Sequence, residues 1–195
     1  MACEDAAMIP SARFRDALVF ACELHAQQRR KGTDIPYVAH LLAVTAIALE
    51  HGATEDEAIA AALHDAVEDQ GGAPTLEEIR RRFGDAVASI VEHCSDTDEV
   101  PKPPWRARKE AYIARLATAP RSALLVSASD KLHNARSILC DARSLGDALW
   151  PRFAGGRDGT LWYYRALVTA FQAALPGPLV DELDRVVCEI ERLSC

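Results

Sequence analysis

Apolar residues recur at three- and four-residue spacing along most of the chain, and few segments alternate with a period of two. Such spacing puts apolar side chains on one face of an α-helix, whereas a half-buried strand requires strict alternation. The pattern predicts helices over residues 11–30, 38–51, 54–70, 75–83, 85–94, 105–118, 121–143, 160–175 and 179–193. We therefore expect an all-α fold, a single-domain bundle of irregularly crossing helices.

Local signals mark several of the expected boundaries. "TEDE" at 54–57 and "TLEE" at 75–78 both fit a capping box, in which a threonine and a glutamate three residues later satisfy the first amide groups of a helix. Gly32 and Pro36 interrupt a basic loop, "RRKGTDIPY" at 29–37. Residues 146–159 are expected to form a short excursion rich in turns.

Charge and cysteine usage limit the partners and the compartment. The net charge of −7 disfavours nucleic acid, so an anionic substrate would need a local basic patch or a cation. The six cysteines are scattered singly, which predicts reduced thiols in the cytoplasm and no cysteine-based zinc site. The chain has neither an apolar run long enough for a bilayer nor a signal-peptide pattern, so no membrane partner is expected. A homo-oligomer is possible.

The stretch "AALHDAVEDQ" at 61–70 sets four ionisable side chains among residues that look buried. Burying charged groups is costly unless they are paired or bind a metal ion. Two other ionisable side chains also lie next to apolar residues: His40 in the stretch "PYVAHLLAV" and Asp130 after the run "LLVSAS". Together with His64 and Asp65 they offer two imidazoles and two carboxylates. This ligand set suits Mn²⁺, Fe²⁺ or Zn²⁺ better than Ca²⁺.

Three blocks in this order resemble a known family: "RRKGTDIPYVAH", "AALHDAVED" and "DKLHNARS". They are similar to the HD-domain phosphohydrolases, and more narrowly to the Rel/SpoT-type guanosine polyphosphate hydrolases in their stand-alone form, the small alarmone hydrolases. The resemblance covers about residues 10–170, with the helix at 179–193 expected to pack on this core. It implies a metal-dependent 3′-pyrophosphohydrolase that converts (p)ppGpp to GDP or GTP and pyrophosphate.

The resemblance also implies roles for particular residues. His40, His64, Asp65 and Asp130 would bind one metal ion, usually Mn²⁺ in this family. Glu68 and Asp69 would activate or orient the attacking water. The nucleotide substrate would contact Arg30, Lys31, Asn134 and Ser137, with Arg29 as the alternative to Arg30 because the basic loop is one residue longer than in the bifunctional enzymes. Nothing in the chain resembles the synthetase domain of those enzymes.

Alternatives remain open from the sequence alone. The substrate could be another nucleotide such as (p)ppApp or NADPH, or the chain could bind an alarmone without turning it over. A pure sensor has no need of a water activator, so the acidic pair at 68–69 disfavours the last alternative. The sequence does not fix the base preference or the roles of His133, Tyr163, Tyr164 and the basic segment 102–109.

Overall fold

The computed structural model describes residues 11–95 and 103–194. Apart from one bridge between Arg29 and Pro36, these ranges contain no β-structure, so the all-α prediction is confirmed. Among the described helices, none combines the length and apolar character needed to cross a bilayer. The elements are α1 (Ala12–Leu24), α2 (Val38–Glu50), α3 (Glu55–Leu63), α4 (Ala66–Asp69), α5 (Ala73–Phe83), α6 (Asp85–Cys94), α7 (Trp105–Leu116), α8 (Arg121–Leu145), η1 (Gly146–Arg152), α9 (Gly156–Ala174) and α10 (Pro178–Leu193).

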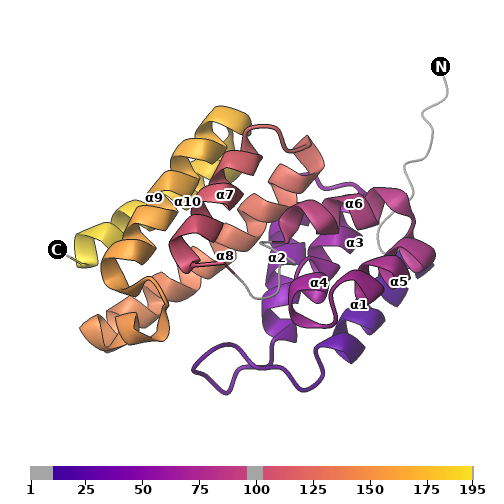
Figure 1. Ribbon diagram of the computed structural model, residues 1–195, viewed down its shortest axis with the longest axis horizontal. Coiled ribbons are helices and arrows are strands. Elements are labelled where there is room, and N and C mark those ends of the chain that lie inside the picture. The colour runs from indigo at the N-terminus through magenta and orange to yellow at the C-terminus, as the bar shows by residue number, and fades with distance from the viewer. Residues whose placement is uncertain (1–10, 96–102, 195) are drawn as a thin grey trace.

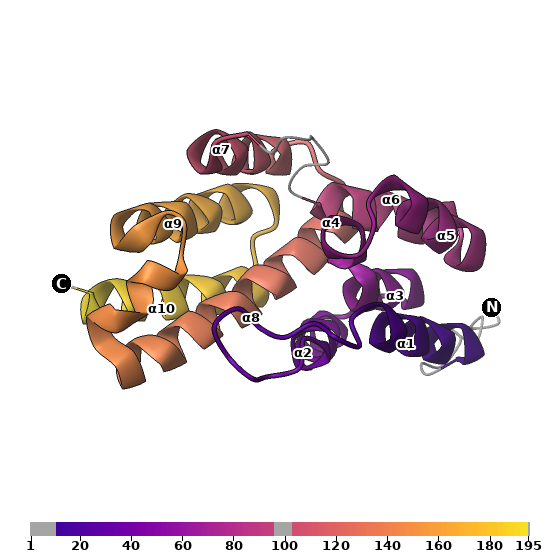
Figure 2. The ribbon, with the colours of Figure 1, turned by 60° about the horizontal axis from the view of Figure 1, so that its bottom comes forward.

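Two apolar cores lie on either side of the molecule, joined by the long helix α8 (Figure 1). One core is formed mainly by α1, α2, α3, α5 and α6, and the other by α7, η1, α9 and α10. Figure 2 shows α7, α9 and α10 as successive layers beside α8. Because α8 contributes side chains to both cores, it fixes one half relative to the other. The single-domain organisation stays a prediction.

Helix α3 lies at the centre of the N-terminal half, against α1, α2, α6 and α8. Its alanines, Ala58, Ala60, Ala61 and Ala62, are all fully buried, as are Ile59 and Leu63. Small side chains let neighbouring helices approach α3 from several directions. The end of α3, with His64 directly after it, therefore lies deep in the protein.

The first helix is shorter than predicted. It ends at Leu24, and the prediction of a helix through residue 30 is wrong. After His25 the backbone turns, with the Gln28 amide donating to the His25 carbonyl at 3.0 Å. Two further hydrogen bonds close the basic loop: Arg30 N–H to Ile35 O at 2.9 Å and Tyr37 N–H to Gln28 O at 2.9 Å. The loop is therefore a closed turn that returns the chain to α2.

The predicted helix over 54–70 is also wrong, because it is broken at His64 and Asp65. The His64 imidazole approaches the Ala61 carbonyl, with Nδ1 2.8 Å from the oxygen. In a continued helix that carbonyl would accept from the amide of Asp65. A side chain that competes for a backbone acceptor favours the end of a helix. The break places His64 and Asp65 at a corner of the chain.

Of the two capping boxes, only the first is confirmed. Thr54 and Glu57 form the reciprocal pair at the start of α3. Thr75 instead lies within α5, which starts at Ala73, and its hydroxyl donates to the Gln70 carbonyl at 2.7 Å. The expected excursion at 146–159 is partly helical: η1 occupies its first half, and α9 begins at Gly156 rather than near residue 160.

Candidate active site

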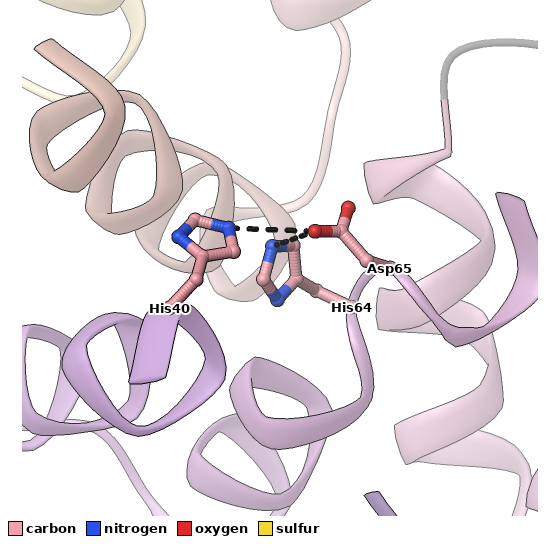
Figure 3. A group of neighbouring side chains, drawn as sticks. All are labelled: His40, His64 and Asp65. Atoms are coloured by element: carbon pink, nitrogen blue, oxygen red, sulfur yellow. Dashed lines mark ion pairs between the residues drawn. The ribbon is translucent and has the colours of Figure 1, made fainter. Parts of the chain in front are cut away.

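The predicted metal ligands come from three separate elements. His40 lies in the first turn of α2, His64 and Asp65 lie at the corner between α3 and α4, and Asp130 lies in the middle of α8. Figure 3 shows the imidazoles of His40 and His64 directed toward the Asp65 carboxylate. His40, His64 and Asp130 are buried, and Asp65 is half-buried.

The structure brings these four side chains together. His64 Nε2 lies 3.0 Å and His40 Nε2 3.4 Å from Asp65 Oδ2. Asp130 Oδ1 lies 3.2 Å from His40 Nε2 and 3.6 Å from His64 Nε2. One ligand atom each from His40, His64 and Asp65 lies within 4.8 Å of the others. Two nitrogens and two carboxylates therefore converge on one point.

The hydrogen bonds of the two imidazoles fit a cation at that point. His64 Nδ1 must donate to the Ala61 carbonyl, which can only accept, so Nε2 of the neutral ring carries a lone pair. His40 Nδ1 lies 2.7 Å from His133 Nδ1 and can donate to it in the same way. Both Nε2 atoms are buried, and neither forms a hydrogen bond to any described residue. Two lone pairs that face two carboxylates are stable only with a proton or a metal ion between them.

The electrostatics keep the carboxylates ionised. Burial alone would raise the pKa of Asp65, but His64 and His40 hold it well below its ordinary value. Asp130 is likewise buried, and Lys131 with the two imidazoles holds its pKa well below the usual range. Burial lowers the pKa of His64, but the two carboxylates outweigh it and raise that pKa well above the ordinary value. A metal ion would replace this proton, since ligands bind in their deprotonated forms.

A further layer of hydrogen bonds orients the ligands. The Tyr37 hydroxyl donates to Asp65 Oδ2 at 2.6 Å. Lys131 Nζ donates to Asp130 Oδ2, and Asn134 Nδ2 to Asp130 Oδ1, both at 2.5 Å. Such contacts fix ligand geometry in metal sites. Sequence reasoning missed Tyr37 and Lys131. Both could have been found from their positions relative to a ligand, since Tyr37 precedes His40 by one helical turn and Lys131 follows Asp130 directly.

The two acidic residues of α4 lie beside the ligands. Glu68 is half-buried. Asp69 lines the adjoining pocket, where its Oδ2 accepts from Gln28 Nε2 at 2.7 Å. Gln28 Oε1 in turn lies 2.6 Å from Nδ1 of the buried His25. Asp69 is exposed at the pocket, yet its partial desolvation together with the negative charges of Asp65 and Glu68 outweighs the Gln28 hydrogen bond and raises its pKa, which favours a role as proton acceptor.

A pocket of about 590 Å³ adjoins the ligands, with His40 in its lining, and extends along α8. All five predicted substrate residues line it: Arg29, Arg30, Lys31, Asn134 and Ser137. Arg30 Nη2 donates to Asn134 Oδ1 at 2.6 Å, which links the basic loop to α8. Arg29 instead pairs with the exposed Asp34 at 2.9 Å. This arrangement favours Arg30 over Arg29 as the inward-facing arginine.

The residues that the sequence left open divide between the pocket and the scaffold. His133 and Tyr164 line the pocket. Burial, His40 and Arg30 lower the pKa of His133 to about 4, so it faces the pocket as a neutral ring. Tyr163 packs edge-on against Trp105 instead. In the basic segment, Lys102 lies outside the described residues, and the Arg106 guanidinium stacks 3.2 Å over the Trp162 ring.

Comparisons with known proteins show the family to which the chain belongs. The HD domain family model matches residues 17–160. The chain is 40% identical over 126 residues to the Xenopus tropicalis guanosine-3′,5′-bis(diphosphate) 3′-pyrophosphohydrolase MESH1, which covers 63% of this chain and 68% of that protein. The Drosophila melanogaster MESH1 is 35% identical over 135 residues, which are 68% of this chain and 73% of the relative.

A solved structure with a similar fold has a TM-score of 0.78 and 29% identity, covering 97% of this chain and all of the other. It is reported as a metazoan orthologue of SpoT that hydrolyses ppGpp and plays a role in starvation responses. The Listeria monocytogenes protein lmo0812 has a TM-score of 0.67 and 30% identity, over 76% of this chain and 96% of that one. The chain therefore belongs to the HD-domain family, and within it groups with the MESH1 and SpoT-like relatives.

Proposed function

We propose that this protein hydrolyses guanosine-3′,5′-bis(diphosphate) and its 5′-triphosphate form at the 3′ position, releasing pyrophosphate and GDP or GTP. One observation carries the proposal: four ligands converge beside a pocket whose lining includes the basic residues Arg29, Arg30 and Lys31. The named activity of the MESH1 relatives supports the same reaction. Since the chain has a net charge of −7, the basic loop and a bound cation are what can attract such an anion.

His40, His64, Asp65 and Asp130 would hold the divalent cation. When bound there, the ion would polarise a phosphoryl oxygen and lower the pKa of water. We propose Mn²⁺, because the two carboxylates supply the oxygen ligands that this ion favours, beside two imidazoles that a divalent transition metal also accepts. Lys131 and Asn134 hold the Asp130 carboxylate in place, and Tyr37 does the same for Asp65.

The remaining residues bind substrate and move a proton. Asp69, held by Gln28 and with a raised pKa, accepts the proton of the attacking water, and Glu68 is the neighbouring carboxylate that shares this task. Arg30 and Asn134 hold the nucleoside near the ligands, and Lys31 meets its phosphates at the pocket mouth. Cleavage of the bond between the 3′ oxygen and its phosphorus leaves a 3′-hydroxyl on the nucleotide.

A turnover assay tests the proposal. Purified protein is stripped of metal, reloaded with Mn²⁺, Zn²⁺, Fe²⁺ or Mg²⁺, and given ppGpp, pppGpp, ppApp and NADPH in parallel. We expect release of pyrophosphate from the guanosine polyphosphates, fastest with Mn²⁺, and none from the stripped protein. If the protein turned over NADPH and none of the other nucleotides, the proposed guanosine substrate would be wrong. Tight binding of ppGpp without product under every metal would identify a sensor.

A further inference from the structure

At the end of the pocket remote from the metal ligands lies a pair of opposite charges. Asp141 is on α8 and Arg152 closes η1, and Arg152 Nη1 lies 3.1 Å from Asp141 Oδ2. Both residues line the pocket. Asp141 follows Asp130 by eleven residues, which is about 16 Å along a helix axis. The pocket therefore has a metal end and a far end with its own polar group.

The far end is closed by contact between two segments that are distant in the sequence. The Arg152 side chain crosses the basic loop at Gly32, where an added Cβ would lie 3.4 Å from its Cδ and Nε. The loop from the N-terminal half also contacts α8 directly, through the hydrogen bond from Arg30 to Asn134 (Figure 2). Gly32, at φ 73°, provides both the turn and the space for the arginine. This contact holds Arg152, and through it Asp141, in a defined position.

The surroundings of the pair do not suit a phosphate group. Asp141 and Arg152 neutralise one another, and the Asp141 carboxylate would repel an anion. Ile138 precedes Asp141 by three residues on α8, Phe153 follows Arg152 directly, and both line the pocket, as does Ile35. Apolar side chains around one polar pair suit a flat, uncharged ring with a hydrogen-bonding edge. Asp141 is the seventh residue after Asn134, about 10 Å along α8, a span comparable with the long dimension of a purine nucleoside.

We propose that the far end binds the purine base and that Asp141 selects guanine over adenine, with Arg152 as the residue that positions Asp141. The proposal rests on the function proposed above. Guanine has two donors, N1–H and N2–H₂, on one edge, and a carboxylate accepts from both at once. Each carboxylate oxygen has two lone pairs, so the bond from Arg152 does not prevent this. Adenine presents the bare N1 acceptor at the same edge and would be repelled.

The test compares guanosine- and adenosine-3′,5′-bis(diphosphate) with wild type and Asp141→Asn. Wild type should favour guanosine in kcat/KM by about 10-fold or more, the usual discrimination of a bidentate pair. Asp141→Asn should lose about 10-fold or more on guanosine and gain on adenosine, because an asparagine amide pairs with adenine. The change should appear in KM, with metal content unaltered. Asp158→Asn is the matched control, since Asp158 pairs with the exposed Arg157 outside the pocket lining.

Two further measurements separate this inference from the proposed function. Binding of the products GDP and ADP needs no turnover: an unchanged GDP to ADP ratio in Asp141→Asn would overturn the base assignment even in an active enzyme. A shifted ratio in a protein that hydrolyses nothing would support the assignment and reject the function. A second comparison uses only the wild-type protein. The inosine analogue lacks the N2 amino group, so it should bind to this protein about 5-fold or more weaker than the guanosine compound. Equal binding would contradict a carboxylate at that edge.

Discussion

The two halves of the molecule differ in what they bury. The described buried polar residues of the N-terminal half include His25, His40, Glu57 and His64, whereas the part after α8 buries Thr160. The C-terminal core is built instead from large apolar side chains, with Phe171, Leu149 and Leu167 fully buried. Helix α8 belongs to both and carries Asp130 on the boundary. One half therefore contributes most of the chemistry, and the other contributes an apolar core and part of the pocket lining, including Phe153 and Tyr164.

The protein separates function from stability along this division. Buried polar groups cost free energy, and here they are confined to helices whose small residues leave room for a hydrogen-bonded site. The C-terminal half has no such cost among its described residues beyond Thr160 and the tyrosine hydroxyls. We therefore expect ligand changes to abolish activity and C-terminal core changes to reduce stability.

The largest effect should follow from His64→Ala. Removing one imidazole opens the metal site and leaves two carboxylates facing each other without it. We expect hydrolysis to fall by about 10³-fold or more, since a catalytic metal supplies several kcal/mol of barrier lowering. Elemental analysis of the purified variant should show a matching loss of metal. His93→Ala is the control, because the exposed His93 makes a similar contact to a helix carbonyl outside the site. Full metal occupancy in His64→Ala would contradict the ligand assignment.

The second-largest effect is expected in the C-terminal half, on stability. Phe171→Ala should lower the free energy of unfolding by about 3–5 kcal/mol, the usual cost of emptying a buried phenylalanine site. Metal content and KM should stay at wild-type values under native conditions, because Phe171 packs in the C-terminal core. Denaturant unfolding and elemental analysis on the same preparation provide both readouts. Loss of metal without loss of stability would contradict the assignment of metal binding to the N-terminal half and of stability to the C-terminal core.

This comparison also explains what the sequence could predict. His64, Asp65 and Asp130 stood out because they are ionisable side chains between apolar neighbours, which can be seen from the adjacent residues in the sequence. The break between α3 and α4 did not stand out, because periodicity does not register a side chain that takes a backbone acceptor, as His64 does at Ala61. The Asp141–Arg152 pair was missed for another reason: it joins two different elements across a turn, and only the tertiary fold brings them together.

The third prediction concerns Asp69. Asp69→Asn keeps the size of the side chain but removes the proton acceptor, so kcat should fall by about 10²-fold while metal content stays unchanged. Glu77→Gln, on the exposed face of α5, is the matched change of charge and should have no effect. Single-turnover rates at saturating Mn²⁺ provide the measurement. Near-wild-type turnover in Asp69→Asn, together with a large loss in Glu68→Gln, would assign the proton transfer to Glu68 instead.

The smallest expected effect concerns the pH dependence of the N-terminal half. Burial raises the pKa of Glu57, but hydrogen bonds from Thr54 and Ser122 and the charge of Arg121 outweigh it, so the pKa lies below its ordinary value of 4.5. A folded-state pKa below the unfolded one adds stability that is present above about pH 4.5 and is lost as the pH falls through the folded value. Glu57→Gln should therefore cost about 1 kcal/mol at pH 7, the usual value of a helix cap.

The sign of this effect provides its own check. The difference between wild type and Glu57→Gln should shrink as the pH falls below 4.5, because protonation of the wild-type carboxyl removes the same charge. Unfolding is measured on metal-free protein, so that metal binding does not add to the stability. Glu50→Gln is the control, because Glu50 is exposed at the end of α2. Its free energy of unfolding should match that of wild type both at pH 7 and below pH 4.5. A difference that grows toward low pH would contradict the lowered pKa and, with it, the view that the capping box at the start of α3 helps to hold the catalytic half together.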